Sequence, residues 1–164
     1  MNVVIRATGL ADWRALKTTR LAALLDAPTA FGASHASVAA FTDEDWQARA
    51  ASTAQRTFVL AYADGQPIGI AAHVVDGQGE CSLQAMWLKR EYRGMEIASS
   101  LVDAVKQCTV AGGYRRLVLD VSPDNARAAA FYRKQGFVFL PQWQPLDSHP
   151  HIQVQTMAWP AAWF

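Results

Sequence analysis

The chain has 164 residues, which is enough for one domain with a buried core. Its 15 Lys and Arg residues nearly balance 14 Asp and Glu residues, giving a net charge of +1. A non-specific nucleic-acid-binding protein normally carries a clear positive excess. No apolar run approaches the roughly 20 residues that cross a bilayer, and no secretory signal is visible. We therefore expect a single cytoplasmic domain over residues 1–164 that binds neither nucleic acid nor membrane.

The metal-ligating residue types are few and badly spaced. Cys81 and Cys108 are too few for a disulfide framework and lack the spacing of zinc ligands. We expect two reduced thiols in or near the core. His149 and His151 stand near Asp147, but without further ligands a surface loop explains them better than a metal site. The sequence predicts no metal.

The first third of the chain predicts one short strand followed by helices. Residues 2–6 form the strand, and a helix begins at Asp12, its candidate cap, and ends before Pro28. The stretch 31–41 is irregular or loosely helical. Thr42 then caps a second, short helix.

The middle of the chain predicts an antiparallel meander. Residues 57–62 and 68–75 are β-branched and apolar, and Asp64-Gly65 between them is a hairpin signal. A second turn at 76–79 leads into the strand 80–88.

Helices and strands alternate after the meander. The expected elements are a helix over 97–110, a strand over 117–121, a helix from Asp124 or Asn125 to Gly136, and strands over 137–140 and 152–157. This order predicts an α/β fold, with a mixed sheet and helices on both of its faces. A Rossmann-type nucleotide-binding domain is disfavoured, because no G-x-G-x-x-G follows an early strand.

One short segment carries the chemistry. In MWLKREYRGMEIAS (86–99), Lys89, Arg90 and Arg93 lie between the end of a strand and a helix that begins beyond Gly94. The free N–H groups and partial positive charge of a helix start suit a phosphate. A solvated basic turn is the alternative on this local pattern alone.

The sequence resembles the GCN5-related N-acetyltransferases, the GNAT superfamily. Arg93-Gly94-Met95-Glu96-Ile97-Ala98 falls in register with the family's acetyl-CoA loop, R/Q-x-x-G-x-G/A. Downstream, Asn125, Tyr132, Gly136 and Phe137 match the family's Asn followed by F/L-Y-x-x-x-G-F. The segment 28–34 and the helix around Trp46 also look like bacterial members, so the resemblance spans nearly the whole chain.

The resemblance implies a mostly antiparallel mixed sheet of six to seven strands with about four helices. It also implies direct transfer of acetyl from acetyl-CoA to a primary amine of a small molecule or peptide, without a metal. The pantetheine arm would bond to the strand near its end, and loop N–H groups would hold the pyrophosphate. The implied cofactor-binding residues are Met86, Trp87, Leu88, Arg93, Gly94, Met95, Glu96, Ile97, Ala98, Ser99, Asn125 and Tyr132.

Two catalytic residues follow from the same comparison. Tyr132 matches the family's general acid, which protonates the departing thiolate; packing against Phe131 is its other interpretation. The family's glutamate base lies near Ser82, and Glu80 is the acid nearest in phase, since strict alternation puts 80, 82, 84, 86 and 88 on one face. Glu80 is otherwise an exposed strand start, and Asp120 is the second choice, unless it is a structural acid.

Glu96 departs from the family pattern, which usually has glycine there because the backbone must approach the pyrophosphate. A carboxylate beside a diphosphate costs about 1 kcal/mol or a few. Glu96 either points to solvent, at a modest cost in backbone strain, or weakens cofactor binding. A catalytically impaired acyl-CoA-binding or sensing module of the same fold is therefore the alternative function, which Asn125 and Tyr132 disfavour.

The C-terminal run WPAAWF (159–164) is unusually apolar for a tail. It predicts either a segment tucked into the sheet or a contact in a homodimer.

Overall fold

A seven-stranded sheet runs through the computed structural model, which describes residues 1–161. The strand order is β1-β2-β3-β4-β5-β7-β6, and every neighbouring pair is antiparallel except β4 and β5. The strands are β1 Val3–Ala7, β2 Arg56–Ala63, β3 Gln66–Val75, β4 Cys81–Leu88, β5 Arg116–Val121, β6 Val138–Leu146 and β7 His149–Pro160. The predicted mixed, mostly antiparallel sheet is confirmed.

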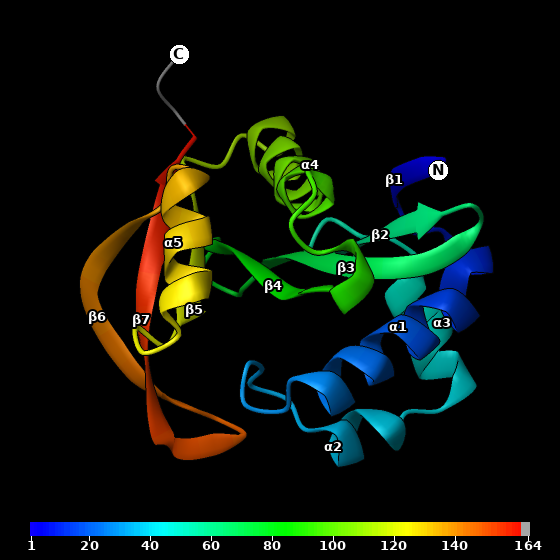
Figure 1. Ribbon diagram of the computed structural model, residues 1–164, viewed down its shortest axis with the longest axis horizontal. Coiled ribbons are helices and arrows are strands. Elements are labelled where there is room, and N and C mark those ends of the chain that lie inside the picture. Colours follow the sequence, from blue (N-terminus) through cyan, green and yellow to red (C-terminus); the bar gives the residue numbers. More distant parts are fainter. Residues whose placement is uncertain (162–164) are drawn as a thin grey trace.

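Helices cover both faces of the sheet, as the sequence predicted. They are α1 Trp13–Asp26, α2 His35–Ala39, α3 Asp43–Ala50, α4 Ile97–Ala111 and α5 Ala126–Lys134, with 3-10 turns at Leu10–Asp12 and Arg90–Tyr92. Figure 1 shows α1, α2 and α3 together on one side of β2–β4, α4 on the other, and α5 beside β5 and β7.

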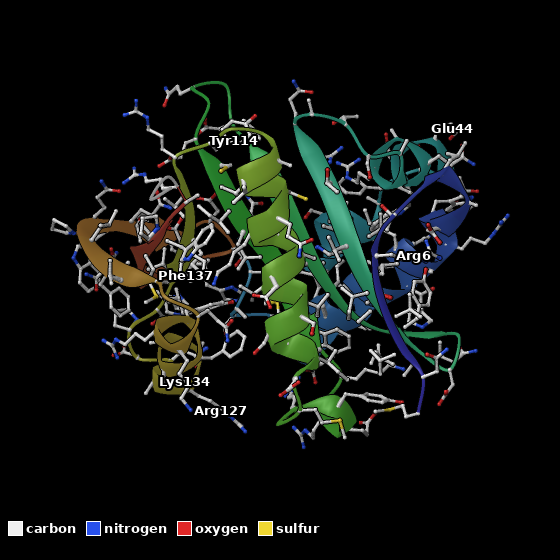
Figure 2. All side chains as sticks on the ribbon, turned by 90° about the horizontal axis from the view of Figure 1, so that it is seen from above. Arg6, Glu44, Tyr114, Arg127, Lys134 and Phe137 are labelled. Atoms are coloured by element: carbon white, nitrogen blue, oxygen red, sulfur yellow. The ribbon has the colours of Figure 1, made fainter. Side chains whose placement is uncertain are left out.

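Each face of the sheet has its own core. On the α4 side, apolar residues of that helix such as Leu101 and Val105 pack on Leu83 and Leu117. On the α1 side, Trp46 and its neighbours pack on alternate residues of β2 and β3. Figure 2 shows α4 lying across the strands, with Arg127 and Lys134 directed away from α5. The central strands β2, β3 and β4 are therefore buried on both faces, which explains their apolar character.

The cap of α1 differs from the prediction. Asp12 makes no side-chain cap bond to α1. Its carboxylate accepts two hydrogen bonds from Arg6 at 2.8 Å each, one from Tyr62 and one from the backbone N–H of Gly9. The carboxylate lies next to a cationic donor that a local helix pattern does not reveal. Thr42, in contrast, caps α3 as predicted, in a capping box with Asp45.

Two segments are more regular than predicted. The stretch 31–41 contains α2, a single short helix capped by the Ser34 hydroxyl. β6 and β7 are longer than predicted because they form one hairpin, and this pairing carries β6 past Pro141 and Pro145 as an edge strand with register shifts. Proline and polar residues hide such a strand from pattern analysis.

The last described residue, Ala161, lies beside the sheet. It is buried, and its N–H donates to the Arg115 carbonyl at 2.8 Å. The other part of the apolar tail, residues 162–164, lies outside the described residues, and so does the homodimer contact predicted there. Cys81 and Cys108 are unpaired thiols, buried and half-buried, as predicted. No helix within residues 1–161 is long and apolar enough to cross a membrane.

Candidate functional site

The sheet opens between β4 and β5. These parallel strands pair only at Cys81 with Leu117 and Ser82 with Val118. Beyond Ser82, the side of β4 that faces β5 has no strand partner, although β4 continues to Leu88 along β3. The main-chain N–H and C=O groups of this stretch that face β5 are consequently available to an extended ligand, except for the Leu88 carbonyl, which accepts a hydrogen bond from Arg93.

A bulge redirects the side chains of β4 at this opening. Between Ala72 and Ile70 of β3, β4 holds one extra residue, because their partners are Gln84 and Trp87. Ala85 has a left-handed φ of 58°, a strained conformation for a residue with a side chain. Strain of this kind is typical of functional sites.

The bulge makes the predicted alternation along β4 wrong. Cys81 and Leu83 face α4, but after the bulge Ala85 and Trp87 face α1, and Leu88 returns to the α4 side. The period-two pattern of a regular strand places Ser82, Gln84 and Met86 on one face, whereas Met86 packs into the α4-side core. One inserted residue reverses the sides of everything that follows it.

The loop after β4 turns at Gly94. Gly94 adopts a left-handed φ of 83°, and the space around its Cα is open. Glu96 is exposed, with φ −79° and ψ 0°, a conformation open to any residue. The expected backbone strain at Glu96 is therefore absent. Its side chain makes no cap bond, so the first N–H groups of α4 remain free to donate hydrogen bonds.

The Arg93 guanidinium is hydrogen-bonded to two neighbouring groups of the protein. Its Nε donates to the Leu88 carbonyl and its Nη2 to Asp26 Oδ2, both at 2.9 Å. The same carboxylate oxygen accepts from Trp87 Nε1 at 2.9 Å. These donors lower the pKa of Asp26, the hydrogen bond from Trp87 contributing most. Arg93 thus fixes the loop to the end of α1, although it is exposed, as are Lys89 and Arg90.

The first turn of α4 is linked to α5. Gln135 Nε2 donates to the Ser99 hydroxyl at 3.0 Å, and Lys106 Nζ donates to the Gln135 carbonyl. Met95 is exposed, Ile97 is buried and Ala98 is half-buried in the α4-side core. The structure brings the loop residues 93–99 together with the end of α5.

The two motif residues found downstream lie at opposite ends of α5, Asn125 at its start and Tyr132 in its last turn. Asn125 caps this helix, since its Oδ1 accepts from the Ala128 N–H at 3.2 Å. The Tyr132 ring packs edge-on against Phe131 and Phe137, at centroid distances of 5.3 and 5.9 Å. Burial raises the pKa of Tyr132 to about 12, so its hydroxyl keeps its proton at neutral pH.

Glu80 lies away from this opening. Its carboxylate pairs with Arg116, with Nη2 to Oε1 at 2.6 Å and Nε to Oε1 at 3.0 Å. It precedes the paired end of β4, and five residues of strand place it about 16 Å from Ala85. The ion pair ties the β4 and β5 ends together, which gives Glu80 a structural role.

Asp120 lies where the strands have separated. The β4–β5 register, continued from Ser82 and Val118, puts Asp120 level with Gln84. Its carboxylate accepts from Gln144 Nε2 at 2.6 Å and from the Thr156 hydroxyl at 2.7 Å. It is exposed and points to the face opposite α4, since Leu119 and Val121 belong to the α4-side core.

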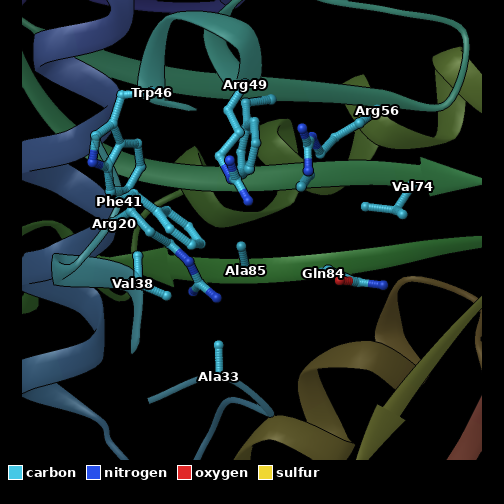
Figure 3. A pocket seen from close by; sticks show the side chains of 12 residues that line it. Arg20, Ala33, Val38, Phe41, Trp46, Arg49, Arg56, Val74, Gln84 and Ala85 are labelled. Carbon is cyan, nitrogen blue, oxygen red and sulfur yellow. The ribbon is translucent and has the colours of Figure 1, made fainter. Parts of the chain in front are cut away.

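A cavity of about 270 Å³ opens on the α1 side of the bulge. Figure 3 shows side chains of α1, α3 and β2 around it, with Ala85 and Gln84 of β4 at its wall. Three arginines, Arg20, Arg49 and Arg56, line it, and no acidic residue among the described residues 1–161 does. Sequence analysis missed this cluster because its members are 29 and 7 residues apart in the chain and follow no motif.

The comparisons with known proteins agree with this geometry. The model of the Acetyltransferase (GNAT) family matches residues 20–137, more than half of the chain. The chain belongs to the GNAT acetyltransferase family. A comparison with curated protein sequences gave no significant match.

Solved GNAT structures share the whole fold. A GNAT-family acetyltransferase from Streptococcus pneumoniae is 23% identical, with a TM-score of 0.79, over 97% of this chain and 99% of that one. YncA of Salmonella typhimurium, solved with its cofactor acetyl-CoA, is 15% identical, with a TM-score of 0.77, over 100% and 96%. PaiA N-acetyltransferase from Thermoplasma acidophilum, solved with coenzyme A, is 18% identical, with a TM-score of 0.72, over 98% and 99%. These TM-scores establish a common fold.

Proposed function

We propose that this GNAT domain binds acetyl-CoA between β4 and β5 and transfers the acetyl group to a primary amine. The observation that carries the proposal is the combination of an unpaired, bulged β4 edge with an open loop at the start of α4. The structural similarity to proteins solved with acetyl-CoA or coenzyme A supports it.

The residues present fit the pantetheine arm and the pyrophosphate of coenzyme A. Main-chain groups of Met86 and Leu88 would hold the pantetheine amides in the way that an added strand is held. The N–H groups from Gly94 to Ser99 would hold the pyrophosphate at the α4 N-terminus, where no side chain competes for them. The Glu96 carboxylate is exposed and free to turn outward, so it is compatible with this site.

When bound, acetyl-CoA supplies an activated acyl group on a thioester. A backbone N–H in the bulged part of β4 would polarise the thioester carbonyl as the amine nitrogen attacks. Tyr132 would then give its phenolic proton to the departing sulfur, for which its protonated state at neutral pH is suited. The amine nitrogen loses its protons to a base, and Tyr132 is reprotonated from solvent.

We assign proton removal to Asp120 rather than to Glu80. A lysine-type amine has a pKa near 10.4 and enters mostly protonated. Asp120 faces the same side as the cavity and lies level with Gln84, which lines that cavity. A carboxylate in this position can accept the proton directly or through one water. Glu80 is occupied by Arg116 at the far end of the strand.

The impaired-module alternative loses its main support. It rested on Glu96, and the ordinary backbone angles and exposure of Glu96 remove the expected strain. Calorimetric titration with acetyl-CoA, followed by thiol release with a panel of amines, tests the proposal. Binding together with amine-dependent thiol release would support it; binding without release from any amine would favour the module.

A further inference from the structure

The arginine cavity lies next to the proposed reaction centre but on the opposite side of β4 from α4. Ala85, the strained bulge residue, forms part of its wall together with Gln84. The remaining wall comes from the three N-terminal helices α1, α2 and α3, the loops beside α2, and the strands β2 and β3. An acceptor placed here would have its amine near the bulge and the rest of the molecule in the cavity.

The three guanidinium groups are oriented toward this space. Figure 3 shows Arg20, Arg49 and Arg56 directed into the cavity from three different elements. Each stacks on an aromatic ring: Arg20 on Phe31 at 4.9 Å, Arg49 on Phe41 at 3.8 Å and Arg56 on Phe58 at 6.0 Å. Stacking fixes the plane of a guanidinium and leaves its edge donors available. One of these donors, Arg49 Nη1, is used in a hydrogen bond to the Asp45 carbonyl at 3.3 Å.

The positive charge in the cavity is unbalanced. The ion pairs found within residues 1–161 involve other arginines, and no Asp or Glu lines the cavity. Arg20 Nη1 is buried with no hydrogen-bond partner. Desolvation lowers the pKa of Arg20 to about 10, and desolvation and the nearby Arg49 charge lower the pKa of Arg56.

Such an arrangement is unfavourable in the free protein. A buried donor without a partner costs its desolvation, and like charges close together repel. Both penalties are relieved by one anionic ligand group that accepts hydrogen bonds from several guanidiniums, as carboxylates and phosphates do. The other cavity residues are mostly apolar and include Val38 and Val74.

We propose that the cavity selects an acceptor that carries, besides its amine, an anionic carboxylate or phosphate group bound by Arg20, Arg49 and Arg56. This inference rests on the proposed acetyl transfer and names the acceptor class for the same site. Coenzyme A phosphates are a poorer fit, because the loop 93–99 that suits them leads into α4 on the other face of the sheet.

Matched pairs of small amines test the charge requirement. The pairs are 4-aminobutyrate with butylamine, L-leucine with L-leucinamide, and phosphoethanolamine with ethanolamine, so that each pair differs mainly in the anionic group. Binding is measured by calorimetry on the CoA-loaded protein, and thiol release is measured with acetyl-CoA. We expect the anionic member of at least one pair to bind at least tenfold more tightly.

Variants locate that preference in the cavity. Arg20→Gln, Arg49→Gln and Arg56→Gln should each reduce the preference about tenfold, and Arg20→Lys should retain part of it. Arg14→Gln is the matched control, because Arg14 is exposed on the same helix as Arg20 and stacks on Trp13. Circular dichroism spectra and melting temperatures check that each variant is folded.

The outcomes separate this inference from the proposed function. The inference is overturned if neutral members bind as tightly as anionic ones, if no member of any pair binds, or if the preference survives in all three glutamine variants. If anions bind through these arginines but acetyl-CoA does not bind, the cavity proposal holds as an anion site while the acetyltransferase proposal fails. Retained acetyl-CoA affinity in the arginine variants excludes the coenzyme as the cavity's ligand.

Discussion

Arg93 and Asp26 join the loop after β4 to the end of α1 through a hydrogen-bonded ion pair of 2.9 Å. Arg93 occupies the cationic position of the family's loop motif, yet its guanidinium donates hydrogen bonds to Leu88 and Asp26 of the protein itself. Its Nε and Nη2 groups organise the loop through these two contacts. Trp87 donates to the same Asp26 carboxylate and so extends this connection to the end of β4.

Replacing either partner should weaken coenzyme A binding to the same modest extent. We expect Arg93→Gln and Asp26→Asn each to raise the Kd for CoA two- to fivefold, because a half-exposed ion pair contributes roughly 0.5–1 kcal/mol. The double variant should be no worse than either single one, since both remove the same contact. Calorimetric titration of the four proteins gives the cycle.

Direct binding of pyrophosphate by Arg93 would give another pattern. Arg93→Gln would then cost tenfold or more, Asp26→Asn would cost little, and the two effects would add. Arg90→Gln is a useful control, because Arg90 is exposed beside the same loop.

Glu96→Gly should change the affinity for CoA by less than about threefold. The residue already has the backbone angles of a helix start, so glycine removes no strain. The remaining effect is the loss of one exposed carboxylate, a screened interaction worth a few tenths of a kcal/mol. Glu96→Gln should also change the affinity for CoA by less than about threefold, both at 50 and at 300 mM salt. A tenfold gain in affinity for Glu96→Gly would show instead that this loop is compromised.

The sequence predicts the order of elements well, because hydrophobic period and turn residues are local properties. The helix over 97–110 and the capping box at Thr42 are examples. The register of β4 is a different matter. The bulge at Ala85 arises from pairing with β3 and from the separation of β5, and neither is visible in the residues around Ala85. Alternation therefore fails where the site lies.

Glu80 and Asp120 should respond differently to neutralisation. Asp120→Asn should lower kcat about 100-fold at pH 7, as expected for loss of a base. Glu80→Gln should leave kcat within about threefold and instead lower the melting temperature, because Arg116 loses its partner. A large kcat loss in Glu80→Gln with an unchanged melting temperature would return the base to Glu80.

Asp12 should make stability depend on pH in the acidic range. The hydrogen bonds from Arg6 lower its pKa from 3.8 to about 2, so the folded state favours the carboxylate. This stabilisation is present above about pH 4 and is lost as the pH falls through the folded-state pKa. Allowing for the exposure of Arg6, we expect about 1 kcal/mol.

Urea unfolding at pH 7, 4 and 2.5 measures this contribution. Asp12→Asn should be less stable at pH 7 and should lose less between pH 4 and 2.5 than the unmodified protein. Asp124→Asn, at an exposed position, is the control. Equal slopes for the two variants would mean that the Arg6 contact contributes nothing to the pH dependence.

The candidate site divides along the same line as the fold. Residues of the loop and of α5, such as Gly94, Asn125 and Tyr132, follow a motif and were identified from it. The arginines of the cavity come from α1, α3 and β2, and only the folded chain brings them together. The spacing of the arginines along the sequence does not predict such a cluster, since each arginine alone resembles an ordinary surface residue.

Titration of the protein and of Tyr132→Phe with acetyl-CoA, with thiol release measured on the same samples, tests the central claim most directly. The ring of Tyr132 packs against Phe131 and Phe137 at the edge of the core. Phenylalanine therefore keeps this packing and removes only the hydroxyl. We predict the same micromolar Kd for both proteins and a kcat at least 100-fold lower for Tyr132→Phe. Absence of binding at millimolar acetyl-CoA, or equal turnover by the two proteins, would contradict the account.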